Sequence, residues 1–151
     1  MQFQRTITPE IVIADQPTEA DLAALKAAGY VGVVNLRNDG EPEQPIGTVL
    51  EGEKVRALGL DYLHMGVGGG SLTEQGVESV VGFLGDHASG KTLVHCRKGG
   101  RAAAIVLLQQ ALEHGWSPTE AIKEGKEIGL DVDGGLRVMV ETYLDDHRKT
   151  S

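Results

Sequence analysis

The residues whose types could do chemistry lie close together in the stretch KTLVHCRKGGRAAA, residues 91–104. Cys96 is the only cysteine in the chain, and Arg97, Lys98 and Arg101 follow it. A thiol beside cations at the start of a helix favours the ionised thiolate, which is a strong nucleophile. An arginine at this distance suits a bidentate contact with the oxygens of an anion. The stretch therefore predicts attack by the Cys96 sulfur on an anionic centre that Arg101 clamps.

The local structure expected around Cys96 is a cradle for an anion. Residues 92–94 form a short apolar run typical of a buried strand, and residues 102–112 favour a helix. The first N–H groups of a helix have no partner within it, and the helix dipole favours negative charge there. Gly99 and Gly100 allow positive φ angles and close approach of the backbone to a ligand. The predicted anion-binding loop comprises His95, Arg97, Lys98, Gly99, Gly100 and Ala102.

Each candidate residue also has a structural interpretation. Cys96 could be a small buried hydrophobic residue, as free cysteines often are, but the cations and glycines beside it favour the functional reading. His95 either supports the thiolate or anchors the loop by a hydrogen bond. Arg37 is expected to pair with a structural carboxylate rather than with substrate. No metal is predicted, because metal-ligand spacing is missing among His64, His87, His114 and His147.

Composition limits the kind of partner. A chain of 151 residues, with 40% hydrophobic and 24% charged residues, fits one soluble domain spanning 1–151. The formal net charge of −8 argues against nucleic-acid binding, so the basic loop at 95–101 favours a small oxyanion over a polyanion. No apolar run approaches membrane-spanning length, and the N-terminus lacks a secretory pattern. A single cysteine cannot form an intrachain disulfide, so a cytoplasmic protein without a membrane partner is predicted.

Hydrophobic periodicity and turn residues predict strands that alternate with helices. The expected strands cover 11–14, 31–36, 62–65 and 92–94. The expected helices cover 18–28, 49–58, 73–87, 102–112, 119–128 and a C-terminal stretch within 133–147, and an exposed loop is expected from the turn at 38–42 to about Thr48. This alternation predicts a single α/β domain with a central, mostly parallel sheet of four to five strands flanked by helices. In such sheets ligands bind at the carboxyl ends of the strands, where the Cys96 loop falls.

Three motifs, in this order, resemble those of a known family: Ile13-Ala14-Asp15-Gln16-Pro17-Thr18, Val34-Asn35-Leu36-Arg37 and His95-Cys96-Arg97-Lys98-Gly99-Gly100-Arg101. Over about residues 8–130 the chain is similar to the bacterial DUF442, or beta-lactamase hydrolase-like, phosphatase-like family. That family lies within the cysteine-based protein tyrosine and dual-specificity phosphatases. The resemblance implies a protein tyrosine phosphatase-like fold and hydrolysis of a phosphate monoester through a phosphocysteine on Cys96. It also implies that Arg101 and the loop amides hold the phosphoryl oxygens, that no cofactor is needed, and that the substrate is a small phosphate ester or a phosphoprotein.

The spacing of the loop opens a second interpretation. Four residues separate Cys96 from Arg101, one fewer than in the tyrosine phosphatase pattern. A shorter loop offers one backbone donor fewer and a tighter ring for the anion. This spacing also resembles the loop of rhodanese sulfurtransferases, which carries a persulfide on cysteine. A rhodanese-like sulfurtransferase or persulfide carrier is therefore an alternative function.

Two further positions differ from the family pattern and open a third interpretation. Ala102 stands where phosphatases usually carry a serine or threonine, whose hydroxyl hydrogen-bonds the leaving thiolate. Gly68 stands where relatives place an aspartate that acts as general acid. Asp39 and Glu41 are the candidates to supply that acid if their loop folds over the site. Without these groups the protein would be a catalytically impaired module that binds an anion or a partner.

Overall fold

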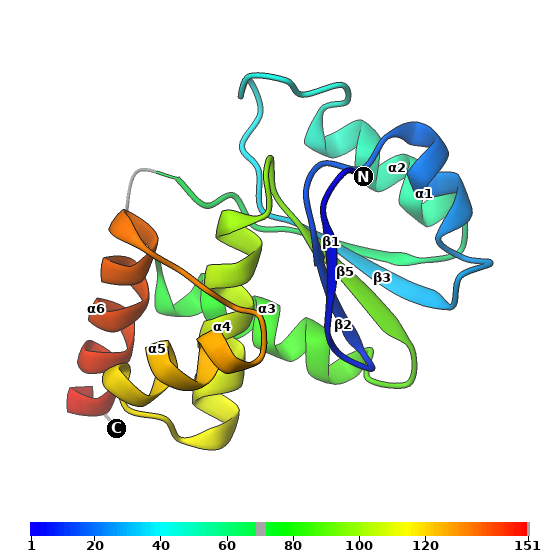
Figure 1. The fold of residues 1–151 in the computed structure, drawn as a ribbon. Helices are drawn as coiled ribbons and strands as arrows, with labels where there is room; N and C mark the ends of the chain where they lie inside the picture. The colour runs from blue at the N-terminus through cyan, green and yellow to red at the C-terminus, as the bar shows by residue number, and fades with distance from the viewer. Residues whose placement is uncertain (69–71, 151) are drawn as a thin grey trace.

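Five strands form one sheet in the computed structural model, which describes residues 1–68 and 72–150 (Figure 1). They are β1 (Gln4–Thr8), β2 (Ile11–Ala14), β3 (Tyr30–Asn35), β4 (Asp61–His64) and β5 (Lys91–His95). Their order across the sheet is β1-β2-β5-β3-β4. Strands β2, β5, β3 and β4 run parallel, and β1 pairs antiparallel with β2. The predicted α/β architecture with a mostly parallel sheet is confirmed.

The strand that the sequence patterns did not predict is β1. Its sequence, QRTIT, is largely polar, because β1 is an edge strand with most of its residues exposed or half-buried. An edge strand needs no continuous apolar run, since only one of its sides pairs with another strand. Its register against β2 shifts between Thr6 and Thr8, which further weakens an alternating pattern.

Helices cover both faces of the sheet (Figure 1). In the described residues, α1 (Glu19–Ala24) and α2 (Thr48–Ala57) lie on one face, and the other face carries α3 (Glu74–Asp86), α4 (Gly100–His114), α5 (Pro118–Glu127) and α6 (Gly134–Thr150). Helix α1 begins at the predicted capping box of Thr18 and Asp21. It ends earlier than predicted, because the chain turns before Gly29, whose φ is +91°. None of the helices described is both long and apolar enough to cross a bilayer.

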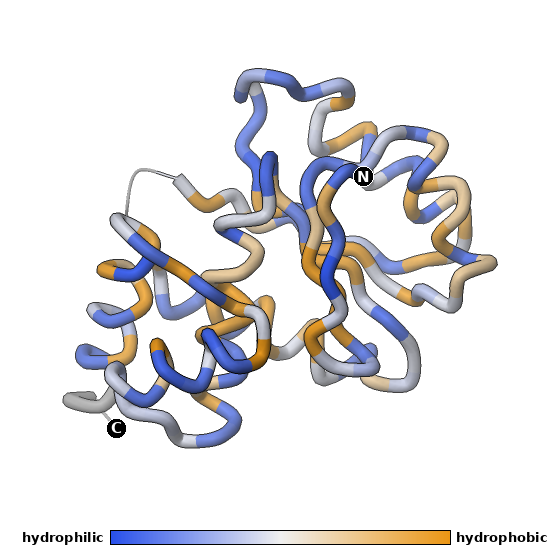
Figure 2. The backbone as a smooth tube through the Cα atoms, in the orientation of Figure 1, coloured by the Kyte–Doolittle hydropathy of each residue, from blue (hydrophilic) through white to orange (hydrophobic). Residues whose placement is uncertain are grey.

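The hydrophobic core forms two layers, one on each face of the sheet. Successive strand residues point to opposite faces, so Ile11 and Ile13 pack with α3 to α6 while Val12 and Ala14 pack with α1 and α2. Figure 2 shows apolar residues both along the central strands and on the helices around them. In α4 every residue from 102 to 108 is buried. The sheet and the helices around it therefore hold the N-terminal end of α4 in a fixed position.

The carboxyl ends of the four parallel strands lie level with one another. Ala14 of β2 and Asn35 of β3 are both in register with His95 of β5, and Asn35 is in register with His64 of β4. The loops that follow these strands therefore meet at one edge of the sheet. These loops carry Gln16, Arg37, Glu41, Val67 and Cys96.

Candidate active site

Cys96 lies directly after β5, where a tight loop leads into α4. The backbone N–H of Gly99 donates a hydrogen bond to the Cys96 sulfur at 3.1 Å, and only 1% of Cys96 is exposed. The expected positive φ occurs at Gly99, with a value of +105°. A Cβ atom there would lie 2.7 Å from the ring of Phe3, so both the conformation and the space require glycine. Gly100 has no positive φ; it begins α4 and packs closely against Leu136.

Arg101, in the first turn of α4, is held by a carboxylate of the chain itself. Its NH1 and NH2 groups donate to the two oxygens of Glu41 at 2.8 and 2.7 Å, and NH1 also donates to the carbonyl of Val67 at 2.9 Å. The Arg101 side chain also forms a hydrogen bond with the Cys96 side chain. The pKa of Arg101 is raised, chiefly by the bonds to Glu41 and further by the nearby Cys96 sulfur. Glu41 and the Val67 carbonyl thus fix the guanidinium in a position where it also interacts with Cys96.

The two carboxylates considered as general acids have other contacts. Hydrogen bonds, first from Arg101 and then from the Asn38 amide and Arg37, lower the pKa of Glu41 from 4.5 to about 2. The two oxygens of Asp39 accept from the N–H and the hydroxyl of Thr48 at 2.8 and 3.0 Å, and these bonds lower the pKa of Asp39. Carboxyls with lowered pKa values carry no proton at neutral pH. In this arrangement neither of them has a proton to donate to a leaving group.

Position 68 leaves little room for the acid that the family pattern has there. Gly68 follows β4, and a Cβ atom at this position would lie 2.9 Å from the side-chain nitrogen of Asn38. A larger residue would therefore require Asn38 to move. The space that an aspartate would need is partly filled by the loop after β3.

The prediction that Arg37 pairs with a carboxylate of the chain is confirmed. Its side chain is completely buried, and its Nε donates to Glu41 at 3.1 Å. Its NH1 donates to the side-chain oxygen of Gln16 at 2.9 Å, and further bonds reach the carbonyls of Pro42 and Glu43. A buried guanidinium is tolerated because its donors have acceptors on several sides. Arg37 therefore ties the loop after β3 to the loop after β2.

His95 is paired with a carboxylate that sequence reasoning missed. The Nε2 atom of His95 lies 2.7 Å from an oxygen of Glu51 in α2, and both side chains are completely buried. The other oxygen of Glu51 accepts from the side-chain amide of Gln16 at 3.0 Å. The only sequence signal for Glu51 is its helical spacing from Val55, on the buried side of α2. A spacing argument alone would have assigned this position to the apolar core.

These bonds connect buried and half-buried side chains into one chain of contacts, which we call the polar network. It begins at His95, immediately before Cys96, and ends at Arg101, in the helix that follows Cys96. In order, its members are His95, Glu51, Gln16, Arg37, Glu41 and Arg101. The network therefore fixes the backbone and the cation on both sides of the candidate nucleophile.

The loop 38–47 is mostly exposed, as predicted, but some of its side chains turn toward the residues around Cys96. Ile46 is buried, and Glu41 reaches Arg101. Glu43 forms an ion pair with Arg97, and its φ of +57° is unusual for a residue other than glycine. Two acidic side chains of this loop, Glu41 and Glu43, therefore pair with the cations that flank Cys96. Lys98 remains exposed and makes no ion pair with a described side chain.

Glu41 should make stability depend on pH in the acid range. Its pKa in the folded protein lies below its ordinary value, so its contribution is complete above pH 4.5 and is lost as the pH falls toward 2. A displacement of this size corresponds to at most about 3 kcal/mol. Urea unfolding of Glu41→Gln is therefore expected to show a smaller loss of stability across this window than the wild type. The exposed control Glu53→Gln should keep the wild-type slope, and an equal slope in Glu41→Gln would contradict the assignment.

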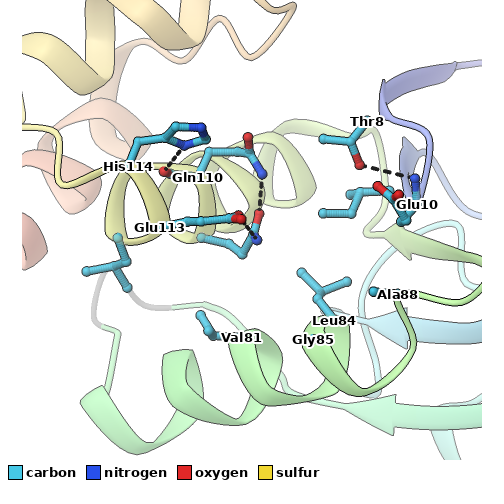
Figure 3. A pocket seen from close by; sticks show the side chains of 12 residues that line it. Thr8, Glu10, Val81, Leu84, Gly85, Ala88, Gln110, Glu113 and His114 are labelled. Carbon is cyan, nitrogen blue, oxygen red and sulfur yellow. Dashed lines mark hydrogen bonds between the residues drawn. The ribbon is translucent and has the colours of Figure 1, made fainter.

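Two of the other histidines, His87 and His114, lie apart from this site, and so does a cavity. His64 instead contacts the site, because its Nε2 lies 2.6 Å from the carbonyl oxygen of Arg37. His87 pairs with Asp61 at 2.7 Å, and His114 bonds the carbonyl of Gln110 at 2.9 Å. In the described part of the chain, no group of three or more His, Cys, Asp or Glu side chains is arranged to hold a metal ion. A cavity of about 620 Å³ lies between α3 and the C-terminal half of α4, at the opposite end of that helix from Cys96 (Figure 3).

Comparison with known sequences gives a consistent relationship. A family described as "Beta-lactamase hydrolase-like protein, phosphatase-like domain" matches residues 3–113. The chain is 33% identical over 132 residues to a beta-lactamase hydrolase-like protein of Agrobacterium fabrum. The match covers 87% of this chain and 30% of that protein, so this chain spans less than a third of the length of that relative.

Comparison with solved structures concerns the fold. A DUF442 protein from Shewanella putrefaciens CN-32 is similar with a TM-score of 0.75 and 22% identity, over 97% of this chain and 89% of the other. Tk-PTP in its active form is similar with a TM-score of 0.75 and 20% identity, over 95% and 96%. At these identities the likeness establishes the architecture, which is that of protein tyrosine phosphatase-like proteins.

Proposed function

Because the chain belongs to the beta-lactamase hydrolase-like phosphatase-like family, we propose that it is a cysteine-dependent phosphatase acting on phosphate monoesters. The Cys96 sulfur attacks phosphorus in line with the leaving oxygen, so an S–P bond forms as the P–O bond breaks. Water then attacks the phosphorus of the phosphocysteine, and the S–P bond breaks. Inorganic phosphate leaves, and the Cys96 thiolate is regenerated.

The observation that carries this proposal is the set of donors around Cys96. The Gly99 amide points at the sulfur, and the amides at the start of α4 lie beyond it. Glu41 holds the NH1 and NH2 groups of Arg101, and the Arg101 side chain also interacts with the Cys96 sulfur. A phosphoryl group on the sulfur would meet a helix N-terminus and a fixed cation, which together stabilise negative charge.

The ionised state of Asp39 and Glu41 bears on the class of substrate. A general acid that protonates the leaving oxygen contributes about 10²–10⁴-fold to the rate. With both carboxylates held ionised by hydrogen bonds, the leaving group must depart with little help. We therefore expect aryl phosphates, including phosphotyrosine, to be preferred over alkyl phosphates such as phosphoserine. A small aryl phosphate or a tyrosine-phosphorylated protein is the substrate class that fits.

Sulfur transfer is the second candidate, and two observations favour it. The loop from Cys96 to Arg101 is short, and among the described residues one backbone amide, that of Gly99, donates a hydrogen bond to the sulfur. Glu41 also occupies two nitrogens of Arg101, which leaves fewer donors for the three oxygens of a phosphoryl group. A persulfide adds one sulfur atom to Cys96 and needs less space and fewer donors than a phosphoryl group.

A paired assay on the wild-type protein separates the two functions. The first arm measures hydrolysis of p-nitrophenyl phosphate, and the second measures sulfur transfer from thiosulfate to cyanide. After each reaction, the mass of the protein reports whether Cys96 carries a phosphoryl group or a sulfur atom. Phosphatase chemistry predicts turnover in the first arm. It also predicts that inorganic phosphate protects Cys96 from alkylation. Turnover only in the second arm, with one added sulfur, would replace the phosphatase proposal by sulfur transfer.

Ala102→Ser is expected to raise turnover if breakdown of the phosphocysteine limits the rate. Ala102 is completely buried in the first turn of α4, two residues after that helix begins. A hydroxyl there would donate a hydrogen bond to the leaving thiolate, worth about 1 kcal/mol or roughly fivefold in rate. Steady-state and burst kinetics with p-nitrophenyl phosphate measure the effect, and Ala103→Ser in the same helix is the matched control. An unchanged steady-state rate in Ala102→Ser would mean that another step is limiting.

A further inference from the structure

A completely buried carboxylate, Glu51, has no part in the reaction described above. It projects from the first turn of α2, a helix on the opposite face of the sheet from α4. One of its oxygens lies 2.7 Å from Nε2 of His95, and the other accepts from Gln16 at 3.0 Å. Both oxygens are therefore committed to partners that lie next to the nucleophile loop.

The contact between Glu51 and His95 reaches the backbone of the nucleophile. The Nδ1 atom of His95 lies 3.4 Å from the carbonyl oxygen of Cys96, on the other side of the imidazole ring. Carboxylate and carbonyl oxygens only accept hydrogen bonds, so each of the two contacts requires a hydrogen on the His95 nitrogen that makes it. The orientation of the ring, and with it the peptide that carries Cys96, is then set by a residue 44 positions away.

Stability alone does not account for this pair. Removing two charged groups from water is costly, and a buried ion pair can often be replaced by well-packed apolar residues at no loss of stability. Glu51 also raises the pKa of Tyr62, although burial is the larger cause. The groups that face Glu51 from the neighbouring elements are His95, Gln16 and Tyr62, and beyond Gln16 lies the guanidinium of Arg37. These contacts fix the position of the His95 ring more effectively than they add to the free energy of unfolding.

We propose that Glu51 is a positioning residue for the nucleophile, acting through His95 to hold the Cys96 peptide in the geometry required for attack. The inference rests on the proposed role of Cys96 as nucleophile, and it holds for either phosphoryl or sulfur transfer. Glu51 touches neither substrate nor the sulfur. Its effect is therefore on the rate of reaction at Cys96 rather than on the binding of the anion.

Three variants test this role. Glu51→Gln keeps the size of the side chain, but its amide cannot accept from both Gln16 and His95. Glu51→Asp keeps the carboxylate and shortens its reach by one methylene group. Glu53→Gln removes an exposed carboxylate from the same helix and is the matched control. Circular dichroism and thermal unfolding identify the variants that fold.

Two readouts separate positioning from simple structural damage. The first is kcat and KM for p-nitrophenyl phosphate. The second is the rate at which iodoacetamide alkylates Cys96 between pH 5 and 9, with and without inorganic phosphate. In Glu51→Gln we expect kcat to fall about 10- to 100-fold with KM nearly unchanged, because small misplacements of reacting groups have effects of this size. The pH dependence of alkylation should also differ from wild type, while phosphate still protects Cys96.

Glu51→Asp is expected to retain part of the lost rate, and Glu53→Gln should behave as wild type. If Glu51→Gln does not fold, Glu51→Asp alone tests the inference. Its shorter side chain still contacts His95 only if the imidazole ring moves. Wild-type kcat and a wild-type alkylation profile in a folded Glu51 variant would overturn the inference. If the wild-type protein hydrolyses no phosphate ester, the phosphatase proposal fails, but the alkylation profiles still test Glu51.

Discussion

Replacing Cys96 with serine is expected to abolish turnover while leaving the fold intact. A serine hydroxyl is close in size to the thiol, but it is not ionised near neutral pH and is a poor nucleophile without an adjacent base. The sulfur is the atom to which the Gly99 amide points, and no other cysteine is available in the chain. We expect a loss of at least about 10³-fold in kcat, as for the removal of other enzymatic nucleophiles.

The same variant should still bind an anion. The first turn of α4 and Arg101 keep their positions without the sulfur, since α4 is buried from 102 to 108 and Glu41 holds the arginine. Calorimetric titration of Cys96→Ser with inorganic phosphate or tungstate should therefore give an affinity similar to that of the wild type. Its thermal midpoint serves as the control for folding. Activity retained in Cys96→Ser, in whichever reaction the wild type performs, would rule out the nucleophile assignment.

Replacing Arg37 with methionine is expected to give the largest loss of stability of any single change in the network. Methionine fills a similar volume but leaves Glu41, Gln16 and two backbone carbonyls without their buried donor. Removing one partner of a buried ion pair typically costs about 3–5 kcal/mol, because the remaining charge is uncompensated. The free energy of unfolding from urea titration at neutral pH measures the effect.

Two further arginine variants make that result specific. Arg137→Met removes a half-exposed arginine whose ion pair with Glu141 lies one turn away in α6, so it should change stability by less than about 0.5 kcal/mol. Arg37→Lys keeps the charge but loses the planar fork, and it should recover only part of the stability. A loss below about 1 kcal/mol in Arg37→Met would mean that the network relaxes around the missing side chain or admits water.

Glu41 both neutralises and orients Arg101. Its carboxylate neutralises Arg101 and is held there by Arg37, so the candidate anion-binding cation already has an anionic neighbour. The same contact fixes the guanidinium in one orientation near Cys96. A fixed cation costs no reorganisation when charge develops at the reacting centre. The low pKa of Glu41 follows from the same geometry, which is why this residue is unsuited to serve as the acid.

The amino-acid sequence by itself determined the parts of this protein that depend on neighbours along the chain. The strand, loop and helix around Cys96 form one continuous stretch, so their order and the glycine at position 99 were readable directly. The capping box at Thr18 and the apolar runs of the parallel strands are equally local. These signals were sufficient for the α/β class, for the edge of the sheet that carries the site, and for the family.

The tertiary structure alone decided which charged groups meet. Glu51 lies 44 residues from His95, and Glu41 lies 60 residues from Arg101, so no periodicity relates them. The sequence offered Glu41 as a general acid, but whether its carboxyl carries a proton depends on what surrounds it. Hydrogen bonds from half-buried Arg101 and from buried Arg37 lower its pKa and keep it ionised. Charge pairing depends on distance and burial in space, whereas the patterns of a single chain report only which residues are neighbours in sequence and which face they share.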